Sequence, residues 1–404
     1  MNILFVSNKM PYPPKDGGSI ATFQHMWGLA SLGQTVTVLT INSKKHFFDV
    51  SQIPIEIRSK INFKTFFLDT SLSAFDALKN LFFSSMPYNA ERFVSEGFEK
   101  YLIEILTQET FDVVQLEGLY LCPYIETIRK YSKALISYRA HNIEHEIWKR
   151  RLEREKNHMK GRYLKLLTKR LESFEKSFIN SYDMIVPITL RDAKQFTDFG
   201  NTKPMLVSPT GIDAKKYEPK PEMIKFPSVF HLGALDWFPN QEALLWFLRN
   251  VWRYISKDYT DLKFYIAGRN APKSLIEEFK KFRNIVFVGE VEDAHEFLNS
   301  HSILIVPLLS GGGMRVKVVE GMALAKTIVS TPIGVEGIPV TVGKEVLIAT
   351  TPDEFIYCIE KLVTDKAFCE EIGQNALSFV RQNFDCNVIT QQLFEFYSKQ
   401  LHDN

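Results

Sequence analysis

The sequence predicts an α/β protein made of two doubly wound, Rossmann-like domains. Three observations support this prediction. The chain has 404 residues, which is more than one hydrophobic core usually organises. Short apolar, β-rich runs alternate with longer amphipathic segments, as in parallel α/β layering. The runs also fall into two sets, each large enough for one parallel sheet.

The expected strands are separated by segments that are expected to be helical. The first set comprises Asn2–Ser7, Thr35–Thr40, Asn62–Leu68, Asp112–Leu116, Lys133–Tyr138, Asp183–Ile188 and Pro204–Ser208. The second set comprises Ser228–Leu232, Leu262–Ala267, Asn284–Val288, Ser302–Pro307, Thr327–Ser330 and Glu345–Ala349. Because strand–helix–strand units build parallel sheets, each set predicts one sheet.

The domain boundary is expected where Pro, Gly and Lys cluster without apolar periodicity. Residues 208–227, SPTGIDAKKYEPKPEMIKFP, have this composition. We therefore expect an N-terminal domain over residues 1–207, a linker over 208–227 and a C-terminal domain over 228–385. Residues 386–404 are expected to form a helix that packs back toward the N-terminal domain.

The composition is that of a globular protein, with 45% apolar and 24% charged residues. Four cysteines lie far apart, without the spacing of a zinc site or a disulfide framework. The sequence opens on an apolar strand without a signal-peptide pattern, and no apolar run reaches the ~20 residues that span a bilayer. We expect a cytoplasmic protein, at most peripheral on the cytoplasmic face of the membrane, with no nucleic-acid partner.

Charge is distributed unevenly along the chain. Residues 1–205 carry 28 Lys and Arg against 22 Asp and Glu, and the remainder carries 21 against 25. Much of the excess lies in Glu144–Ser181, which is expected to be one long helical segment. Between Lys149 and Lys176 this segment holds eleven Lys and Arg against four acids. Its basic face is either an ordinary solvated surface or a surface that meets anionic lipid.

A diglycine loop, NKMPYPPKDGGS, follows the first expected strand. Gly17 and Gly18 would allow backbone N–H groups to approach a phosphate or a sugar at a helix N-terminus. The alternative is a turn that needs positive φ. The dinucleotide pattern GxGxxG is absent, and the second strand ends without an acidic residue for a ribose, which disfavours an NAD enzyme.

A second glycine-rich loop, PLLSGGGMRVKVVEGMALA, follows a later expected strand and leads into a helix that should begin near Met314. Arg315 and Lys317 fall in the first turn, where the helix dipole disfavours cations by ~0.3–1 kcal/mol each. An anion would compensate, so we predict a diphosphate site here, with Glu320 accepting hydrogen bonds from ribose hydroxyls. The alternative is a plain surface pair between Lys317 and Glu320. The predicted donor-binding set is Gly17, Gly18, Gly233, Gly312, Gly313, Met314, Arg315, Lys317 and Glu320.

A third segment, SYRAHNIEHEIW, lies at the carboxyl end of the strand expected over Lys133–Tyr138. A histidine in this position can bind a sugar hydroxyl or move a proton near neutral pH. The predicted acceptor side therefore comprises Arg139, His141 and Asn142. Glu144 is interpreted as a favourable charge in the first turn of the next helix, and His145 as a surface residue.

Several motifs are absent from the sequence. There is no Asp-x-Asp clamp for a metal-bound diphosphate, no HExxH, no GxSxG and no Walker A lysine. These absences disfavour metalloproteases, triad hydrolases and P-loop NTPases. We therefore expect neither a metal nor an organic cofactor.

Taken in order, six segments resemble glycosyltransferase family 4, whose members are retaining enzymes with the GT-B fold. The segments are NILFVSNKMPYPPKDGGSIATFQHMWGLASLGQTVTVLT, SPTGID, HLGALDWFPNQEALLWF, FYIAGRN, NIVFVGEVED and VPLLSGGGMRVKVVEGMALAKTIVSTPIGVEGI. The resemblance covers nearly the whole chain. It implies two Rossmann-like domains facing a deep cleft, with the nucleotide-sugar donor on the C-terminal domain and the acceptor on the N-terminal one.

The sequence departs from the family pattern at two points. The family's glutamate pair, E-x7-E, keeps its second member at Glu320, whereas the first position falls on Gly312. The Arg and Lys that often follow the first strand of the second domain are replaced by GALDWFPN. We infer a sub-branch with GGGxRxK, in which Arg315 and Lys317 take over the phosphate charge. The predicted catalytic residues are His141, from its position at the carboxyl end of a strand, and Arg315 and Lys317, from their charge at the diphosphate.

The expected function is therefore metal-independent transfer of a sugar from a nucleotide-diphosphate sugar to an acceptor hydroxyl with retention. The acceptor is expected to be a saccharide or a lipid-linked molecule, in the biosynthesis of a cell-surface polysaccharide or glycoconjugate. Two alternatives share the fold. One is a nucleotide-sugar-binding or scaffold protein without catalysis, and the other is a nucleotide-sugar epimerase.

Overall fold

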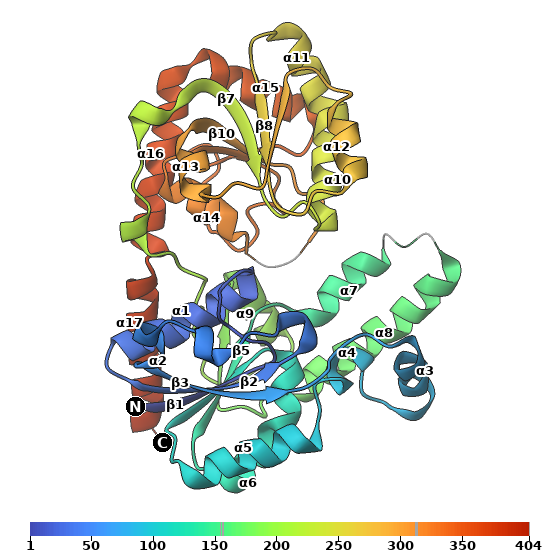
Figure 1. Ribbon diagram of the computed structural model, residues 1–404, viewed down its shortest axis with the longest axis vertical. Helices are drawn as coiled ribbons and strands as arrows, with labels where there is room; N and C mark the ends of the chain where they lie inside the picture. The colour runs from blue at the N-terminus through green and yellow to red at the C-terminus, as the bar shows by residue number, and fades with distance from the viewer. Residues whose placement is uncertain (154, 156, 312–313, 404) are drawn as a thin grey trace. The chain divides into compact units, whose positions relative to one another are not determined.

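A computed structural model describes residues 1–153, 155, 157–311 and 314–403. The chain divides into two compact units (Figure 1). Unit 1 comprises Met1–Gly211 and Cys386–Asn404, and unit 2 comprises Ile212–Asp385. The strands of the described residues form two six-stranded sheets, one in each unit, and every neighbouring pair is parallel. This is the fold class that the alternating sequence pattern predicts.

In unit 1 the strand order is β3-β2-β1-β4-β5-β6. The strands are β1 (Asn2–Ser7), β2 (Thr35–Asn42), β3 (Ile61–Phe67), β4 (Val113–Glu117), β5 (Leu135–Ala140) and β6 (Met184–Pro187). The helices are α1 (Gly17–Ser31), α2 (Ile55–Arg58), α3 (Ala74–Phe83), α4 (Tyr88–Glu91), α5 (Glu96–Gln108), α6 (Ile125–Tyr131), α7 (Glu144–Leu152), α8 (His158–Ser177), α9 (Leu190–Asp198) and α17 (Cys386–His402).

In unit 2 the strand order is β12-β11-β10-β7-β8-β9. The strands are β7 (Lys225–Leu232), β8 (Phe264–Ala267), β9 (Ile285–Gly289), β10 (His301–Val306), β11 (Thr327–Ser330) and β12 (Leu347–Ile348). The helices are α10 (Phe238–Phe247), α11 (Arg253–Asp258), α12 (Lys273–Phe279), α13 (Ala294–Asn299), α14 (Val316–Ala323), α15 (Pro352–Thr364) and α16 (Lys366–Asn383).

Each sheet is buried on both faces because its central strands are apolar on both sides. In β1, Ile3 and Phe5 belong to one hydrophobic cluster, whereas Leu4 and Val6 belong to another. Side chains alternate between the two faces of a strand, so a continuous apolar run needs helices on both sides of the sheet. Strand β10 divides in the same way between the two clusters of unit 2.

All but one of the strands expected from the sequence are present, with ends that differ by a few residues. The exception is Pro204–Ser208, where the prediction is wrong. This segment makes a single parallel bridge, between Ile185 and Met205, beside β6. Ser208 donates to the carbonyl of Pro187 (2.9 Å), but Pro187 has no backbone N–H to donate in return, so the ladder is not continued.

The long helical segment expected from Glu144 to Ser181 is two helices. Helix α7 ends at Leu152, and α8 begins at His158 because Asn157 caps it, accepting a hydrogen bond from the backbone N–H of Lys160 (3.1 Å). The helix expected from about Met314 begins at Val316 instead. Among the described residues, no helix has the length and apolar character needed to cross a membrane.

The C-terminal helix α17 is part of unit 1 and packs on α1. Gly28 of α1 permits the close approach, since a Cβ atom at this position would overlap the side chain of Thr390. Thr390 is buried, and its hydroxyl donates to the carbonyl of Cys386 (2.7 Å). Further along α17, Tyr397 is fully buried in the cluster that contains Phe5. The last helix therefore completes the core of unit 1.

Gly28→Ala is expected to destabilise the protein. The overlap with Thr390 forces α1 and α17 apart at a cost of ~1–3 kcal/mol, which exceeds the ~1 kcal/mol by which alanine favours a helix over glycine. The midpoint of urea denaturation, followed by circular dichroism, measures the effect. Gly161→Ala, within α8, is the matched control because a Cβ there meets nothing within 4 Å. If Gly28→Ala were as stable as this control, the packing argument would be wrong.

Candidate functional site

Each sheet has a topological switch point, where the order of the strands reverses. In unit 1 it lies between β1 and β4, and in unit 2 between β7 and β10. Open α/β sheets bind ligands beyond the carboxyl ends of their strands at such points. The loops after β5, β7 and β10, together with the N-terminal turns of α1 and α14, carry most of the described residues that the sequence singled out.

A cavity of about 600 Å³ lies at the carboxyl edge of the unit 1 sheet. Its walls come from the loops after β1, β4 and β5 and from the segment between β3 and α4. Three predicted residues line it, namely Gly18, His141 and Asn142. Glu117 and Glu144 also line it, although the sequence analysis assigned neither to a ligand site. The structure thus brings the diglycine loop and the predicted acceptor side to one cavity.

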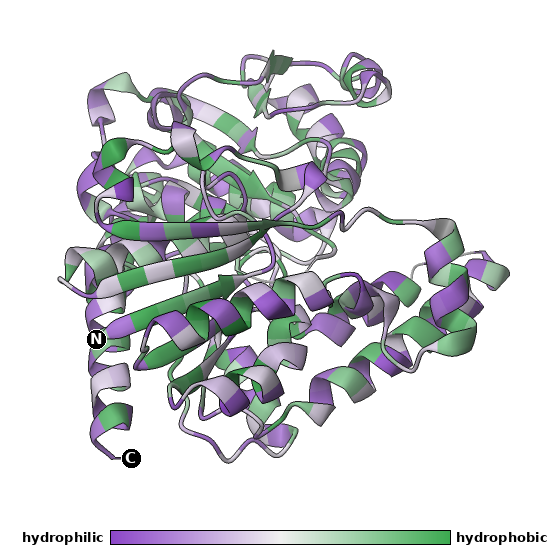
Figure 2. Cartoon of the chain, turned by 60° about the horizontal axis from the view of Figure 1, so that its bottom comes forward, coloured by the Kyte–Doolittle hydropathy of each residue, from purple (hydrophilic) through white to green (hydrophobic). Residues whose placement is uncertain are grey.

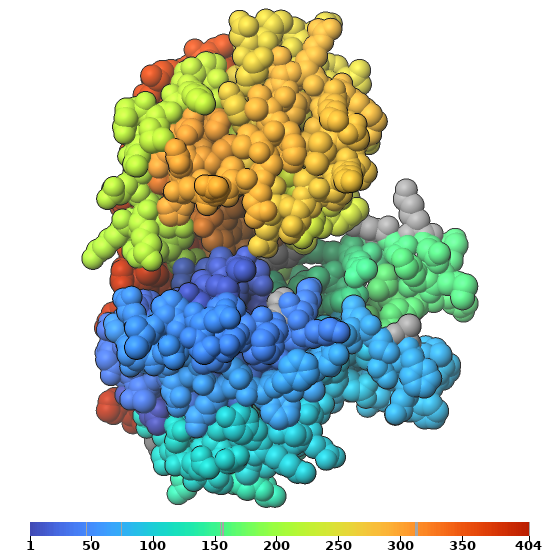
Figure 3. Space-filling view, viewed as in Figure 1, coloured from blue at the N-terminus to red at the C-terminus, as the bar shows by residue number. Residues whose placement is uncertain are grey.

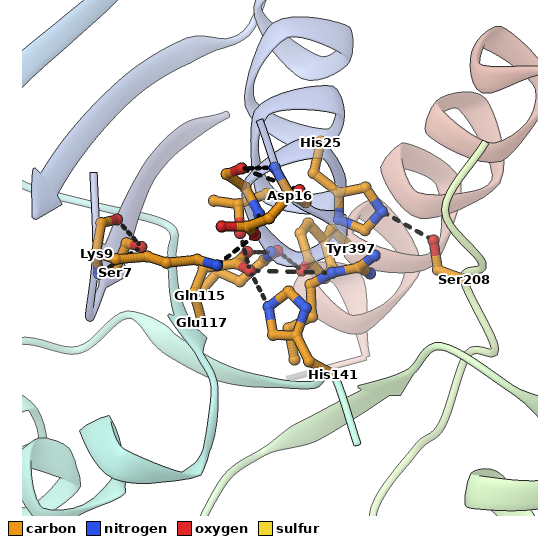
Figure 4. Close-up of polar contacts among 12 residues, drawn as sticks. Ser7, Lys9, Asp16, His25, Gln115, Glu117, His141, Ser208 and Tyr397 are labelled. Atoms are coloured by element: carbon orange, nitrogen blue, oxygen red, sulfur yellow. Dashed lines mark hydrogen bonds and ion pairs between the residues drawn. The ribbon is translucent and has the colours of Figure 1, made fainter. Parts of the chain in front are cut away.

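Glu117, the last residue of β4, holds His141 in place (Figure 4). The His141 Nε2 atom lies 2.7 Å from Oε2 of Glu117, and the Thr22 hydroxyl donates to the same oxygen (2.8 Å). An ionised carboxylate accepts only, so Nε2 carries the proton and donates. The other ring nitrogen of His141, Nδ1, is buried without a hydrogen-bond partner among the described residues. A buried polar atom of this kind indicates a place for a ligand group or a water molecule.

The Glu117 carboxylate stays ionised although its side chain is 1% exposed. Burial alone would raise its pKa, but the hydrogen bond and charge of His141, the charge of Arg139 and the Thr22 hydroxyl outweigh burial and lower the pKa. The compensation of a buried charge by an opposite charge and hydrogen bonds is the usual condition for keeping it. His141 is therefore held beside a permanent negative charge.

Two further buried side chains connect this carboxylate with α17 (Figure 4). The Gln115 amide donates to Glu117, and the Tyr397 hydroxyl donates to Oε1 of Gln115. The same hydroxyl lies 2.9 Å from Oγ of Ser137. Glu117 is thus positioned by a chain of hydrogen bonds that ends in the C-terminal helix.

Arg139 does not line the cavity, so its predicted contact with an acceptor is corrected. It belongs to β5, which ends at Ala140 rather than at Tyr138, and its side chain is 0% exposed. Its Nε lies 4.0 Å from Oε2 of Glu117. Among the described residues, none of its guanidinium nitrogens has a hydrogen-bond partner. Arg139 acts as a buried counter-charge beneath the cavity.

The diglycine loop forms the N-terminus of α1. Asp16 caps this helix, accepting a hydrogen bond from the backbone N–H of Ser19 (2.9 Å), and forms an ion pair with Lys9 (2.5 Å). Neither Gly17 nor Gly18 has a positive φ, so the alternative of a turn that needs positive φ is wrong. A Cβ on Gly18 would lie 2.9 Å from Nζ of Lys9.

Glu144 faces the cavity from the first turn of α7, and it is more than the helix-terminal charge expected from the sequence. It accepts a hydrogen bond from the Tyr120 hydroxyl (2.8 Å). Burial raises the pKa of Glu144 to about 7, although Tyr120 and Asn142 bind its carboxylate. His145 is likewise not a surface residue: it is buried, and its Nδ1 lies 2.6 Å from Glu175.

In unit 2, Lys317 reaches from the first turn of α14 to the loop after β7. Its Nζ donates to Oδ1 of Asn240 (3.1 Å). A Cβ on Gly233 would lie 3.1 Å from the same Nζ, so glycine leaves room for the ammonium group. The surface pair with Glu320, considered as an alternative, is not found among the described residues. The structure brings Lys317 and Gly233 together at the switch point.

Burial and the charge of Arg315 lower the pKa of Lys317 to about 7. The adjacent His231 is fully buried, and its Nδ1 donates to the carbonyl of Ile305 (3.0 Å). Burial and the charge of Lys317 hold the pKa of His231 well below its usual value, so this ring is neutral. Among the described residues, the hydrogen-bond partner of the Lys317 ammonium is the neutral Asn240, so an anion would stabilise this charge.

Arg315 is the N-cap residue of α14 rather than part of its first turn. It is 7% exposed, and its guanidinium lies 5.6 Å from the centre of the Trp237 ring. Gly311, which precedes it, has φ of 114°. Met314 packs against the core of unit 2. Gly312 and Gly313 lie outside the described residues.

Glu320 accepts a hydrogen bond from the Tyr217 hydroxyl (3.0 Å), and burial raises the pKa of its carboxyl. The Tyr217 ring packs against His295, tilted by 34°, with the ring centroids 4.4 Å apart. The predicted ribose contact of Glu320 stays a prediction. In the described part of the chain, no group of three or more His, Cys, Asp or Glu is placed to hold a metal ion.

Four residues of the two sites were not predicted from the sequence, namely Glu117, Gln115, Tyr397 and Asn240. Glu117 had a local signal, since an acid ending an apolar strand, VVQLEG, lies where ligands bind. Gln115, Tyr397 and Asn240 had none. Their partners are 2, 282 and 77 residues away, respectively, and only the folded chain shows which of these separations matter.

Comparison with solved structures identifies the fold. Anabaena HepE in complex with UDP superposes with a TM-score of 0.69 at 15% identity, covering 99% of this chain and 100% of that chain. Sucrose-phosphate synthase from Thermosynechococcus elongatus gives a TM-score of 0.73 at 14% identity, covering 100% of each. The chain has the GT-B fold.

Sequence comparison adds two similarities. Residues 226–365 match the family model Glycosyl transferases group 1. A protein described as an uncharacterized 44.6 kDa protein in the cps region of Klebsiella pneumoniae is 25% identical over 411 residues, covering 97% of this chain and 99% of that protein. Together with the GT-B fold, the family match supports a glycosyltransferase of the GT-B superfamily. Assignment to family 4 and to its GGGxRxK sub-branch stays a prediction.

Glu144→Gln is expected to stabilise the protein, by more at about pH 8 than at about pH 5. Burial raises the pKa of Glu144, so the folded chain favours the protonated carboxyl. In the unfolded chain a glutamate has a pKa of ~4.3. The contribution of Glu144 to the free energy of unfolding is therefore fully present below that pH, and it is lost as the pH rises through about 7, the pKa of Glu144 in the folded chain. Glutamine stays neutral and avoids this loss.

Thermal denaturation midpoints at the two pH values measure this effect. Glu126→Gln is the matched control, because Glu126 occupies the first turn of α6 and is exposed. The prediction would be wrong if the rise in denaturation midpoint for Glu144→Gln did not depend on pH, or if it equalled the rise for the control. Either result would show that burial does not raise the pKa of this carboxyl.

Proposed function

We propose that the protein transfers a sugar from a nucleotide-diphosphate sugar to an acceptor hydroxyl, with retention at the anomeric carbon. The observation that carries this proposal is the position of Lys317. It is a partly buried cation at the switch point of unit 2, inside the segment that matches the glycosyltransferase model. Such a cation, close to a glycine and at the start of a helix, is suited to a diphosphate.

The proposed donor binds unit 2 through Lys317 and Arg315, with Glu320 toward the ribose. Structures of Anabaena HepE contain UDP and UDP-glucose. UDP is therefore the first nucleotide to test, followed by GDP. The acceptor is proposed to bind the cavity of unit 1, near His141 and Asn142, as the resemblance to family 4 implies.

In the proposed reaction, the acceptor oxygen bonds to the anomeric carbon on the face from which the diphosphate departs. The bond from that carbon to the diphosphate oxygen breaks, and this oxygen takes the acceptor proton. Lys317 and Arg315 offset the charge that develops on the diphosphate, a contribution of the kind whose removal costs ~10²–10³ in rate. His141, held by Glu117, orients a sugar hydroxyl. No metal is required in this scheme.

We infer a role in the biosynthesis of a cell-surface polysaccharide or glycoconjugate. The support is the Klebsiella relative, whose name places it in a cps region. The acceptor is then a saccharide, free or lipid-linked, and the protein acts on the cytoplasmic side. We also propose peripheral contact with anionic membrane through the basic α7–α8 segment.

A second candidate is a protein that binds nucleotide sugars without transferring them, or one that epimerises them. The feature that favours it is Gly312, at the position where family 4 has its first glutamate. Isothermal titration with a panel of nucleotide sugars, combined with assays of donor hydrolysis, separates these candidates. A transferase consumes the donor, a binding protein leaves it intact, and an epimerase converts it to an isomer.

Lys317→Ala and Arg315→Ala are each expected to weaken UDP binding by ~1.5–3 kcal/mol, the scale of a hydrogen bond to a charged group. In the unaltered protein, affinity should also fall as the pH rises above 7. UDP binds the protonated form of Lys317. Above pH 7 this lysine is mostly neutral in the protein without UDP, so binding must take up a proton and becomes weaker.

Isothermal titration in a pH series above the second phosphate pKa of about 6 measures both effects. Lys317→Arg stays charged and should flatten the pH dependence. Lys344→Ala, an exposed lysine of unit 2, is the control and should bind as the unaltered protein does. Normal UDP binding by both alanine variants would place the diphosphate elsewhere.

Sugar transfer is expected to persist after exhaustive treatment with EDTA, because side-chain cations take the place of a metal at the diphosphate. The release of nucleotide diphosphate in the presence of acceptor is the readout. Activity that disappears with EDTA and returns with Mn²⁺ or Mg²⁺ would refute the assignment of phosphate neutralisation to Arg315 and Lys317.

A further inference from the structure

Helix α3 of unit 1 exposes an apolar face that no other described segment covers. Phe75, Leu78 and Phe82 are 76%, 55% and 71% exposed, and their spacing places them along one side of the helix. Leu72, before the helix, and Phe83, at its end, extend this face and are 74% and 84% exposed. Scattered exposed apolar residues are ordinary, but a contiguous group of this size marks an interaction site.

A second apolar stripe, on α8, leads onto α3. Met159, Tyr163 and Leu166 follow at helical spacing and are exposed. The same side of the helix continues to Arg170, whose guanidinium donates to the carbonyl oxygens of Asn80 (3.4 Å) and Leu81 (3.0 Å) in the last turns of α3. The two helices therefore adjoin, as Figure 3 shows at the right-hand edge of unit 1.

This stripe is distinct from the side of α8 that faces the core. Leu164, Leu167 and Leu171 are buried and provide the packing that a core-facing helix needs. The exposed apolar residues are additional to them. Figure 2 shows hydrophobic and hydrophilic positions interleaved along the helices at the right-hand end of that view.

The charges around the apolar residues are basic. Lys160, Arg162, Lys165 and Lys169 are exposed on α8, and no acidic residue occurs between Asn157 and Leu171. On α3, Lys79 is exposed beside one acid, Asp76. Aromatic and aliphatic side chains flanked by lysines and arginines match a bilayer, in which anionic headgroups lie above acyl chains.

The apolar face also borders the candidate acceptor cavity. Leu72 contributes to both, and Thr70 and Ser71, which lead into α3, line the cavity as well. A molecule that is anchored in a bilayer under α3 could therefore extend its polar end into the cavity without leaving the membrane.

We propose that α3 and the exposed stripe of α8 dock on an anionic bilayer, with the side chains of α3 inserted among the lipids, and that the acceptor is lipid-linked. The membrane contact proposed above for the α7–α8 segment depends on basic charge alone. The surface described here adds apolar side chains of α3 that insert into the bilayer. The assignment of the acceptor rests on the proposed transferase function, but the docking does not.

Co-sedimentation with vesicles of phosphatidylcholine, with and without phosphatidylglycerol, tests the docking in the full-length protein. The unaltered protein should bind the anionic vesicles and retain part of this binding at high salt. The variant with Phe75→Ser and Phe82→Ser should lose at least tenfold in partitioning, and the variant with Lys165→Gln and Lys169→Gln should bind less at low salt. Ile55→Ser removes an apolar residue that is 78% exposed elsewhere on unit 1 and should change nothing.

Insertion is measured directly with Phe82→Trp, whose added fluorescence should shift to the blue on anionic vesicles and be quenched by brominated lipid. Four results would overturn the proposal. They are no binding to anionic vesicles, equal binding to neutral ones, full binding by the phenylalanine variant, and a dimer that dissociates in this variant without any binding to vesicles. The last result would show that a second copy of the chain covers this face.

Titration of the same variants with UDP separates the docking from the proposed transferase. The phenylalanine variant should bind UDP as the unaltered protein does, since its changes lie in unit 1 and the proposed nucleotide contacts lie in unit 2. Docking with no donor turnover on any acceptor would refute the transferase alone. Sugar transfer to water-soluble acceptors without docking would refute the membrane surface and the lipid-linked acceptor alone.

Discussion

The parallel pairing of the described strands is the constraint on which the rest of the structure depends. A parallel pair needs a crossover connection, so the carboxyl ends of all strands in a sheet emerge at one edge. This brings together residues from neighbouring strands that are far apart in sequence. Glu117 ends β4 and meets His141, which follows β5, because Glu117 and Arg139 are opposite one another in the pairing of these strands. In unit 2, β10 lies next to β7, so Lys317 reaches the loop that contains Gly233.

Buried charge imposes a second constraint, which differs between the two units. In unit 1, the charges of Glu117 and Arg139 are both buried and offset one another, and the carboxylate keeps a histidine oriented at the cavity. In unit 2, Lys317 has a neutral hydrogen-bond partner in Asn240, and the nearby His231 is neutral as well. A charge without a compensating ion is costly when buried, so this arrangement favours an anionic ligand. The charges of the first site thus compensate one another, whereas the second site is suited to an anion.

The C-terminal helix links the fold to the site in unit 1. Gly28 allows α17 to lie close to α1, and Tyr397 then reaches the buried amide of Gln115. Residues that end the chain thereby position a carboxylate on a central strand. The outer side of unit 1 serves a different purpose, because α3 buries little of its apolar surface and borders the cavity that Glu117 and His141 line. Unit 1 therefore combines a hydrogen-bonded polar site with an exposed apolar face on α3.

The sequence by itself determined the two sheets, because strand periodicity and glycine-rich loops are local signals. It also singled out Gly18, His141 and Lys317, which lie after strands, in a loop or at a helix N-terminus, where such sheets bind ligands. Their contacts with ligands stay predictions. Two predictions failed because the local pattern was compatible with two structures. The helical pattern from Glu144 onward is two helices, the second capped by Asn157, and Arg139 belongs to the strand rather than to the loop after it. Only the tertiary structure decided that Glu117 supports His141, that Asn240 binds Lys317 and that the apolar face of α3 stays exposed. Each depends on contacts between segments distant in sequence, and neither composition nor periodicity records such contacts.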